Sequence, residues 1–466
     1  MSEYRLPDGT VPVLLSSETP DGLRAEAAQL ARYLADRPEV TPDRVADMLF
    51  RTRTARRRRA LAMVSGRDEL LTALESIAAD TEHPAVVQSL GAATARRTGF
   101  VFPGQGSQRP GMGKLYYGLS QAYRDEVDAC AELHREHYGH AQPLHYLLGE
   151  EGLFENTVWE VQPALMFHMT GLAAMWRAFG VRPAAAIGHS QGELAAGWVA
   201  RVMTRRDAVM AVTERARLVE RISPRGYSMA VLGMDREEVE ALLARHSGWA
   251  ELSVVNSPHI LAISGDRDTI VDMVAAAQAK GKFAKEIQVA YPAHTSIVAE
   301  LRTDFENFLG AEMSAPTFSA GEIPCYGATL GAEITPDLEH EQYWFWNLRN
   351  RVRFDRAIVS AAVDGIDTFV EVAEHPTLQL AVQENLGLVP QDPALPPRDF
   401  RVLGTSLRTA DSLRDFTRNL ATVAVHDLAY DWQSLRTPDT SGKVTLPLRD
   451  FPNTVMNPQR LWAAFA

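Results

Sequence analysis

A serine stands between two glycines at the junction of a short apolar strand and an alanine-rich helix. Residues 184–200 read AAAI-GHSQG-ELAAGWVA, with Ser190 at the centre of the G-x-S-x-G pattern. A turn this tight leaves no room for Cβ atoms beside the serine, so Gly188 and Gly192 favour it. A second apolar strand, in FVFPGQGSQRPGMG at residues 100–113, also runs into a glycine-rich loop. Strands that enter helices through such loops are typical of an α/β fold.

The chain of 466 residues is long enough for about three structural units. Strand and helix patterns alternate over residues 1–98, which predicts a small α/β unit. Residues 226–290 contain two strand-helix-strand passages and are expected to form a ferredoxin-like α+β insertion. We expect the flanking ranges 99–225 and 291–395 to form one larger α/β subdomain. A Pro-rich stretch at 387–399 indicates a linker.

The charge balance of 47 basic and 59 acidic residues, or −12, argues against a general nucleic-acid binder. Six of the nine residues from Arg51 to Arg59 are arginine, and we expect a solvated helix or a charged interdomain face there. Two cysteines, Cys130 and Cys325, are too few for a disulfide framework or a cysteine-rich metal site, so we expect buried structural thiols and no metal.

The sequence carries no sign of membrane insertion or secretion. No apolar run approaches the length of a membrane span, and the polar opening MSEYRLPDGT has no signal-peptide layout. We therefore expect a cytoplasmic protein with no membrane partner.

Ser190 needs a base to act as a nucleophile, because a serine hydroxyl is a weak nucleophile at neutral pH. Its position at a helix N-terminus favours developing negative charge. Of the thirteen histidines, His189 should point away from Ser190 on the same turn, whereas His294 in VAYPAHTSIVAEL follows an apolar strand and could project over a cleft. The remaining candidates are expected to be packing or surface residues: His168, His259 and His375.

Taken together, the motifs resemble the acyltransferase domains of modular polyketide synthases and the related malonyl-CoA:acyl-carrier-protein transacylases. The resemblance covers the whole chain, and the motifs agree in order and spacing. Matching segments are FVFPGQGSQRPGMG at 100–113, VQPAL at 161–165, GHSQGE at 188–193, Arg215, NSP at 256–258 and YPAH at 291–294. Residues 1–98 look like the linker domain that precedes such acyltransferases, and residues 396–466 like the C-terminal linker, in which RDFPNTVMNPQRLW wraps back.

The resemblance implies a role for each matching residue. Ser190 would be acylated by a CoA thioester, and His294 would take its proton and later activate the carrier-protein thiol. Backbone N–H groups of Gln105 and Gln191 would form the oxyanion hole, and Arg215 would hold a free carboxylate. Without the family, Arg215 reads as a helix-surface cation, and Arg217 is an equal candidate. Further matching residues expected in the substrate-binding site are Gln162, Tyr291, Ala293 and Asn256.

Arg215 favours a malonyl-type extender unit over a simple acyl group. In the family, Tyr at the first position of the motif at 291–294 goes more often with methylmalonyl, whereas HAFH goes with malonyl. The small Ala293 leaves room for an α-methyl group, so we favour methylmalonyl. Two departures from the family pattern remain: YPAH where YASH is usual, and AEHP at 373–376 where SPHP is usual.

Two other functions are compatible with parts of the pattern. A serine hydrolase or thioesterase could use the same Ser-His pair, with Asp266, Asp268 or Asp272 as the acid. The FPGQG loop and Arg215 argue against a hydrolase, which needs no carboxylate clamp. A docking scaffold with a degenerate site is disfavoured by the intact motifs.

The expected partners follow from the family. They are an acyl carrier protein with its phosphopantetheine thiol, a malonyl-type acyl-CoA as substrate and a ketosynthase or other synthase domains, with no permanently bound cofactor. LPDG…VPVLLS at the N-terminus and FAKEIQVAYPAHTS look most like the synthases of mycobactin-type and nocobactin-type siderophores. We expect the chain to be an excised fragment or the opening of a larger polypeptide.

Overall fold

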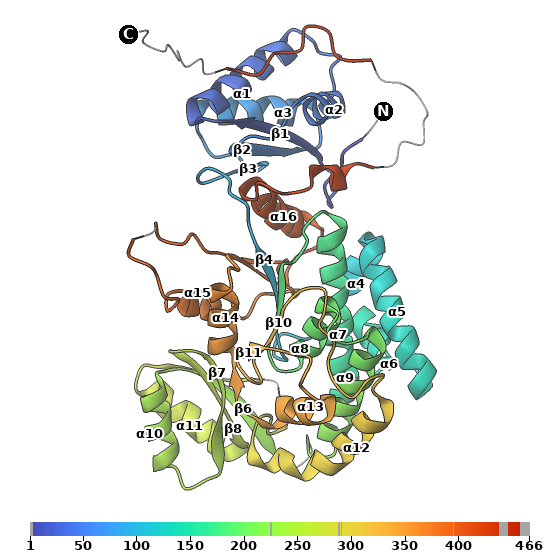
Figure 1. Cartoon of the computed structure of the whole chain (residues 1–466), viewed down its shortest axis with the longest axis vertical. Coiled ribbons are helices and arrows are strands. Elements are labelled where there is room, and N and C mark those ends of the chain that lie inside the picture. The colour runs from blue at the N-terminus through green and yellow to red at the C-terminus, as the bar shows by residue number, and fades with distance from the viewer. Residues whose placement is uncertain are drawn as a thin grey trace. The chain divides into compact units, whose positions relative to one another are not determined.

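The computed structural model describes residues 3–223, 226–287, 289, 291–394, 396–437 and 446–456 (Figure 1). The chain forms two compact units. One comprises Met1–Arg96, Ala178–Val181 and Ser412–Ala466, and the other comprises Arg97–Arg177 and Arg182–Asp411. No helix in the described part of the chain is long and apolar enough to cross a membrane.

The first unit is built on a three-stranded antiparallel sheet with the order β1-β2-β3. Apolar side chains of the sheet and of three helices form one core, which includes Val13, Leu34 and Val45. The elements of this unit are β1 Val11–Ser17, α1 Pro20–Ala35, α2 Pro42–Thr52, β2 Arg58–Val64, α3 Arg67–Ala79, β3 Val86–Gln88, α16 Arg414–His426 and η3 Trp432–Leu435.

The arginine-rich run differs from the expected solvated helix. It leaves α2 at Thr52 and enters β2 at Arg58, so only its first part is helical. Arg59 is buried, and its guanidinium donates hydrogen bonds to the carbonyl oxygens of Ala424 and Asp427 at the end of α16. The orphan carbonyls at the end of a helix need such donors, which explains why a charged residue is buried here.

The described part of the C-terminal tail lies along α1 and α2. Tyr33 donates a hydrogen bond to the carbonyl of Arg449 at 3.0 Å, and the backbone N–H of Val455 donates to Glu26 at 3.0 Å. The remainder of the expected wrap-back segment, residues 457–462, lies outside the described residues.

The second unit contains a six-stranded sheet with the order β11-β10-β5-β4-β13-β14. All neighbouring pairs are parallel except β10 and β11. The strand β14 pairs with β13, so the core sheet continues beyond residue 395, where we expected the linker to begin. The strands are β4 Thr98–Phe102, β5 Ala185–Gly188, β10 Cys325–Gly327, β11 Ala332–Glu333, β13 Thr368–Glu371 and β14 Arg401–Gly404.

A second sheet in this unit has five strands in the order β12-β7-β8-β6-β9. Four of them, with two helices, follow the βαββαβ order of a ferredoxin-like subdomain. The fifth strand, β12, comes from outside the expected insertion and pairs with β7 in parallel. These elements are β6 Tyr227–Gly233, α10 Arg236–Arg245, β7 Ala250–Ser257, β8 Ile260–Asp266, α11 Arg267–Ala279, β9 Phe283–Ile287 and β12 Val352–Arg353.

Successive side chains of β6 and β8 point to opposite faces of this sheet, and both faces are apolar. Ala230 and Leu232 of β6 belong to the core that includes Ile270 and Met273 of α11. Their neighbours Met229 and Val231 point to the opposite face, as the period of two requires. A half-buried sheet normally carries polar residues there, so this apolar face is available to line a pocket.

The remaining helices of the second unit surround the two sheets. They are α4 Lys114–Leu119, α5 Gln121–Tyr138, α6 Gln142–Leu148, α7 Val158–Ala178, α8 Gly192–Ala200, α9 Arg205–Glu220, η2 Ser296–Leu301, α12 Arg302–Glu312, α13 His340–Arg349, α14 Phe354–Val363 and α15 Gln379–Leu386. Together with the two sheets, they confirm the predicted fold class: an α/β-hydrolase-like core that carries a ferredoxin-like subdomain.

Close packing of the β5–α8 turn yields a stability prediction. A Cβ atom on Gly192 would overlap the carbonyl oxygens of Phe102 and Pro103. We expect Gly192→Ala to lower the free energy of unfolding by about 1–3 kcal/mol, because these backbone atoms cannot move away cheaply. Urea denaturation measures the change.

Gly118→Ala is the matched control. Gly118 lies in α4 with nothing within 4 Å of its Cβ position, so the substitution should be neutral or stabilise by up to about 1 kcal/mol. Equal stability of Gly192→Ala and the native chain would show that the turn has more room than the structure gives it.

Candidate active site

The structure brings Ser190 and His294 together. The Oγ atom of Ser190 lies 2.8 Å from Nε2 of His294, and both side chains are buried. Ser190 sits at the turn between β5 and α8, and His294 follows β9 by several residues. Both residues have positive φ angles, 54° and 61°, which are strained for side-chain-bearing residues. Such strain persists only where surrounding contacts hold it.

Backbone groups at the end of α13 hold His294. Its Nδ1–H donates to the carbonyl of Asn350 at 3.0 Å, and its backbone N–H donates to the carbonyl of Leu348 at 3.2 Å. A carbonyl can only accept, so Nδ1 carries the proton and Nε2 is free to accept the Ser190 hydroxyl proton. No carboxylate hydrogen-bonds to His294 in the described part of the chain, and Asp266, Asp268 and Asp272 are not its partners.

His294 is held in its neutral form. Burial, and then the positive charge of Arg215, lower the pKa of His294 to about 3 from its ordinary 6.5. A neutral imidazole is the form that can accept a proton, so His294 is ready to act as a base across the physiological pH range.

His189 and Asn256 form a separate contact beside the nucleophile. As expected, His189 points away from Ser190: its Nε2 lies 2.8 Å from Oδ1 of Asn256, and its ring packs against Phe354. Asn256 therefore contacts the nucleophile turn through the His189 ring, and it is also one of the residues that line the inner pocket.

Arg215 and Arg217, which the sequence did not distinguish, occupy different environments. The Arg215 side chain is buried, and its Nη2 lies 3.3 Å from Oγ of Ser190. Arg217 is about half exposed and pairs with Glu214. Only Arg215 therefore reaches the nucleophile.

Four side chains form a connected group around the Arg215 guanidinium. Arg215 Nη1 donates to Oε1 of Gln162 at 2.7 Å. The amide nitrogen of Gln162 donates to Gln105 and to Tyr291, each at 2.9 Å, and the Tyr291 hydroxyl donates to Gln105 at 3.0 Å. The Nε of Arg215 is buried and has no partner among the described residues. One donor of the guanidinium is therefore left for an acceptor from outside the chain.

The oxyanion candidates Gln105 and Gln191 are in loops that flank Ser190. Both residues line the inner pocket, and neither backbone N–H makes a hydrogen bond within the described part of the chain. An unpaired N–H beside a nucleophile can bind a developing negative charge.

A network of hydrogen bonds around the buried Glu193 side chain supports the turn that carries Ser190. Glu193 accepts hydrogen bonds from the Thr329 backbone and hydroxyl, both at 2.9 Å, and from Tyr343 at 2.6 Å. Asn347 donates to Thr329 at 3.1 Å and to the carbonyl of Ser190 at 2.9 Å. Burial raises the pKa of Glu193 to about 7.

The sequence pattern did not single out Asn347. An asparagine in a helix such as HEQYWFWNLR gives no local signal, since Ser190, the partner that ties it to the site, is 157 residues away. Glu193 stands in the quoted GHSQGE motif, but only the fold shows that it is fully buried.

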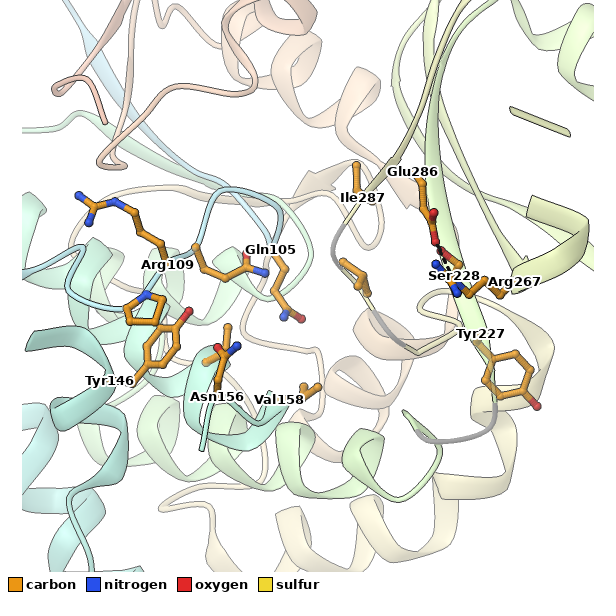
Figure 2. Close-up of a pocket in the computed structure, with 14 residues that line it drawn as sticks. Gln105, Arg109, Tyr146, Asn156, Val158, Tyr227, Ser228, Arg267, Glu286 and Ile287 are labelled. Atoms are coloured by element: carbon orange, nitrogen blue, oxygen red, sulfur yellow. Dashed lines mark hydrogen bonds and ion pairs between the residues drawn. The ribbon is translucent and has the colours of Figure 1, made fainter. Parts of the chain in front are cut away.

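The site opens into two adjoining pockets. The inner one, about 200 Å³, contains Ser190 and His294, and its wall includes Met229 and Val231 from β6 and the small Ala293. The outer one, about 710 Å³, shares Gln105, Ile287 and Val289 with it. Figure 2 shows the two sides of the outer pocket: Gln105, Arg109 and Tyr146 from the core, opposite Ser228, Arg267 and Glu286 from the ferredoxin-like subdomain.

Comparison with known proteins decides the family. The family model described as "Acyl transferase domain" matches residues 99–429. The spectinabilin polyketide synthase system protein NorA' of Streptomyces orinoci is 34% identical over 445 residues, which are 95% of this chain and 12% of that protein. The chain belongs to the acyltransferase domains of modular polyketide synthases. It spans about an eighth of that relative's length.

Solved structures of acyltransferase domains have the same fold. The acyltransferase domain from module 8 of the salinomycin polyketide synthase is 31% identical, with a TM-score of 0.80, and the match covers 91% of this chain and 97% of that one. The acyltransferase domain of SpnD, in complex with 2-(pent-4-yn-1-yl)malonyl, is 25% identical with a TM-score of 0.75, covering 91% and 97%. These matches agree with the α/β-hydrolase-like core and ferredoxin-like subdomain.

The low pKa of His294 predicts an unusual pH profile for this acyltransferase domain. We expect the rate of Ser190 modification by phenylmethanesulfonyl fluoride to stay near its plateau from about pH 8 down to about pH 5, because His294 stays neutral there. Removing a cation raises the pKa of a nearby histidine, so Arg215→Ala should move the acid limb to higher pH.

The control is His294→Ala, which should react slowly at every pH. A native profile with its midpoint near the ordinary histidine value of 6.5 would contradict the environment described for His294.

Proposed function

We propose that this chain transfers a malonyl-type acyl group from CoA to an acyl carrier protein through an acyl-serine intermediate. The observation that carries the proposal is the 2.8 Å contact between Ser190 Oγ and a neutral His294, with the Arg215 guanidinium 3.3 Å from the same oxygen. A nucleophile, a base and a cation that can bind a carboxylate therefore converge on one point.

In the first half-reaction, His294 Nε2 takes the hydroxyl proton as Ser190 Oγ attacks the thioester carbonyl. The tetrahedral intermediate collapses to the acyl-serine, and the CoA thiolate leaves with the proton returned by His294. In the second half-reaction, His294 takes the proton of the phosphopantetheine thiol as its sulfur attacks the ester carbonyl. The tetrahedral intermediate then breaks its bond to Ser190 Oγ, which regains its proton from His294. The carbonyl oxygen of each intermediate would accept hydrogen bonds from the free N–H groups of Gln105 and Gln191.

Arg215 would bind the free carboxylate of the extender unit. Its burial, its position beside Oγ and its unpartnered Nε support this role. Gln162 and Tyr291 hold the guanidinium and Gln105 in one hydrogen-bonded group, which fits a pre-arranged carboxylate site.

The pocket lining supports methylmalonyl over malonyl. The inner wall carries the small Ala293 and the apolar Met229 and Val231, where an α-methyl group would replace water. The related SpnD domain was solved with a malonyl group that carries a longer α-substituent, so this fold can place an alkyl chain at the same carbon.

The remaining partners are proposed by the same reasoning. Acyl-CoA is a substrate, and no permanently bound cofactor is needed for this chemistry. The acceptor would be a carrier protein, with a ketosynthase or other synthase domains in the same assembly. A siderophore pathway, suggested by LPDG…VPVLLS at the N-terminus and by residues 283–296, stays a prediction.

Intact-protein mass spectrometry tests the acyl-serine. Brief incubation with methylmalonyl-CoA should add one methylmalonyl group that maps to Ser190, and Ser190→Ala should remain unmodified. An adduct on Ser190→Ala would place the nucleophile elsewhere. Rapid release of free acid from the native chain, without an adduct, would favour a hydrolase.

The carboxylate clamp has its own test. Arg215→Ala should lose at least about 100-fold in loading from malonyl-type CoA esters, because a charge-assisted bidentate pair is removed, while it accepts acetyl-CoA better than the native chain. Arg217→Ala is the matched control on the same helix and should load normally. Unchanged dicarboxylate loading by Arg215→Ala would disprove the clamp.

The extender preference can be measured by competition. With equal malonyl-CoA and methylmalonyl-CoA, the adduct mass should report mainly methylmalonyl. Ala293→Phe should shift loading toward malonyl by about 10-fold or more, since the α-methyl group then meets the ring. Malonyl as the main adduct of the native chain would reverse the assignment.

A further inference from the structure

An ion pair joins the Gln105 loop to the next loop of the core sheet. Arg109 lies within the segment between β4 and α4, four residues after Gln105, and Glu374 lies in the segment that follows β13. The guanidinium contacts both carboxylate oxygens of Glu374, with Nε at 3.1 Å and Nη2 in close contact. Two parallel hydrogen bonds fix both distance and orientation.

Besides this ion pair, side-chain hydrogen bonds restrain the Gln105 loop: the Gln105 amide oxygen accepts from Gln162 and Tyr291, which hold the side chain but do not bond to the Gln105 backbone N–H. The loop contains no helix or strand between Phe102 and Lys114. The Gly106 N–H bonds to the Gln108 side chain within the loop, and Arg408 donates to the carbonyl of Ser107 at 3.1 Å. Gly106 itself has a φ of 144°, which only glycine adopts easily. A loop of this kind needs outside contacts to keep a backbone N–H in place.

Hydrogen bonds to β13 and β4 hold the loop that carries Glu374. Glu371, at the end of β13, is buried and accepts hydrogen bonds from the backbone N–H groups of Thr377 at 2.7 Å and Leu378 at 2.9 Å. The N–H of Val372 bonds to the carbonyl of Val101 in β4 at 2.8 Å. The loop therefore closes on its own strand, and Glu374 stands on a rigid support.

Glu374 is also one of the two residues, with Ala373, that depart from the family pattern, in AEHP where SPHP is usual. Its side chain is 8% exposed, whereas that of Arg109 is 40% exposed. A mostly buried carboxylate needs a partner, and burial raises the pKa of Glu374 while Arg109 opposes that rise. The ion pair between Arg109 and Glu374 is therefore partly buried.

We propose that Arg109 and Glu374 are positioning residues that hold the Gln105 backbone N–H in place for the oxyanion. This inference rests on the acyl transfer proposed above. The hydrogen bonds of Glu371 hold the loop after β13, and Glu374 in that loop holds Arg109 through the ion pair. Arg109 in turn restrains Gln105, which lies four residues earlier in the same loop. Because an oxyanion donor acts on the transition state and not on bound substrate, its displacement lowers kcat and leaves KM nearly unchanged.

The test measures kcat and KM for Ser190 acylation by methylmalonyl-CoA. Complete loss of one oxyanion donor costs about 100- to 1,000-fold in kcat, so partial displacement in Glu374→Gln or Arg109→Gln should cost about 10-fold. The exchanged double variant R109E/E374R should recover to within about threefold of the native kcat, since it restores the pair with reversed charges. Thermal unfolding checks that each variant is folded.

Glu132→Gln is the matched control. It removes an exposed ion pair with Arg135 on α5 and should leave kcat and KM unchanged. If both single variants keep the native kcat, the inference is wrong. The proposed function would still stand in that case, provided that Ser190 of the native chain is acylated. A rise in KM confined to Arg109→Gln would also overturn the inference, by assigning Arg109 to substrate binding. Absence of acylation in the native chain would instead remove the proposed function and this inference with it.

Discussion

The hydrogen bond from His294 Nδ1 to the Asn350 carbonyl is the contact on which the site depends. It fixes the imidazole tautomer without a carboxylate, and it places the base at the negative end of α13. The same helix supplies Asn347, which holds the carbonyl of Ser190. One helix end therefore restrains both strained residues, and the 2.8 Å contact between them follows from its position.

Buried carboxylates support the loops around this pair. Glu193 lies under the nucleophile turn, and Glu371 lies under the loop that carries Thr377 and Leu378. Each accepts several hydrogen bonds from groups that would otherwise be buried without partners, and burial raises the pKa of each to about 7. The loops at the carboxyl ends of β5 and β13 are thus fixed by polar contacts inside the core.

Local chemistry explains why Ser190 could be found from the sequence. Both glycines of the turn stand within two residues of Ser190, so the turn is visible as a pattern, although only Gly188 avoids a local clash, with Glu193, and Gly192 makes room for Phe102 and Pro103. The fold class was predictable for the same reason, since strands and helices alternate along the chain. Long-range pairing was not: β12 and β14 join their sheets from outside the expected ranges, and Asn347 meets Ser190 across 157 residues. Arg215 and Arg217 read alike until burial separates them.

Strand β12 has a mechanical consequence. It begins at Val352, two residues after the Asn350 carbonyl that holds His294, and it pairs with β7 of the ferredoxin-like subdomain. His294 itself follows β9, the last strand of that subdomain. The base and its acceptor thus stand at two of the crossings between subdomain and core, apart from the crossing between α9 and β6. A rotation of the subdomain that widened the cleft would therefore displace both His294 and the Asn350 carbonyl. Opening of the cleft for a bulky thioester and alignment of the His294 imidazole are thus coupled.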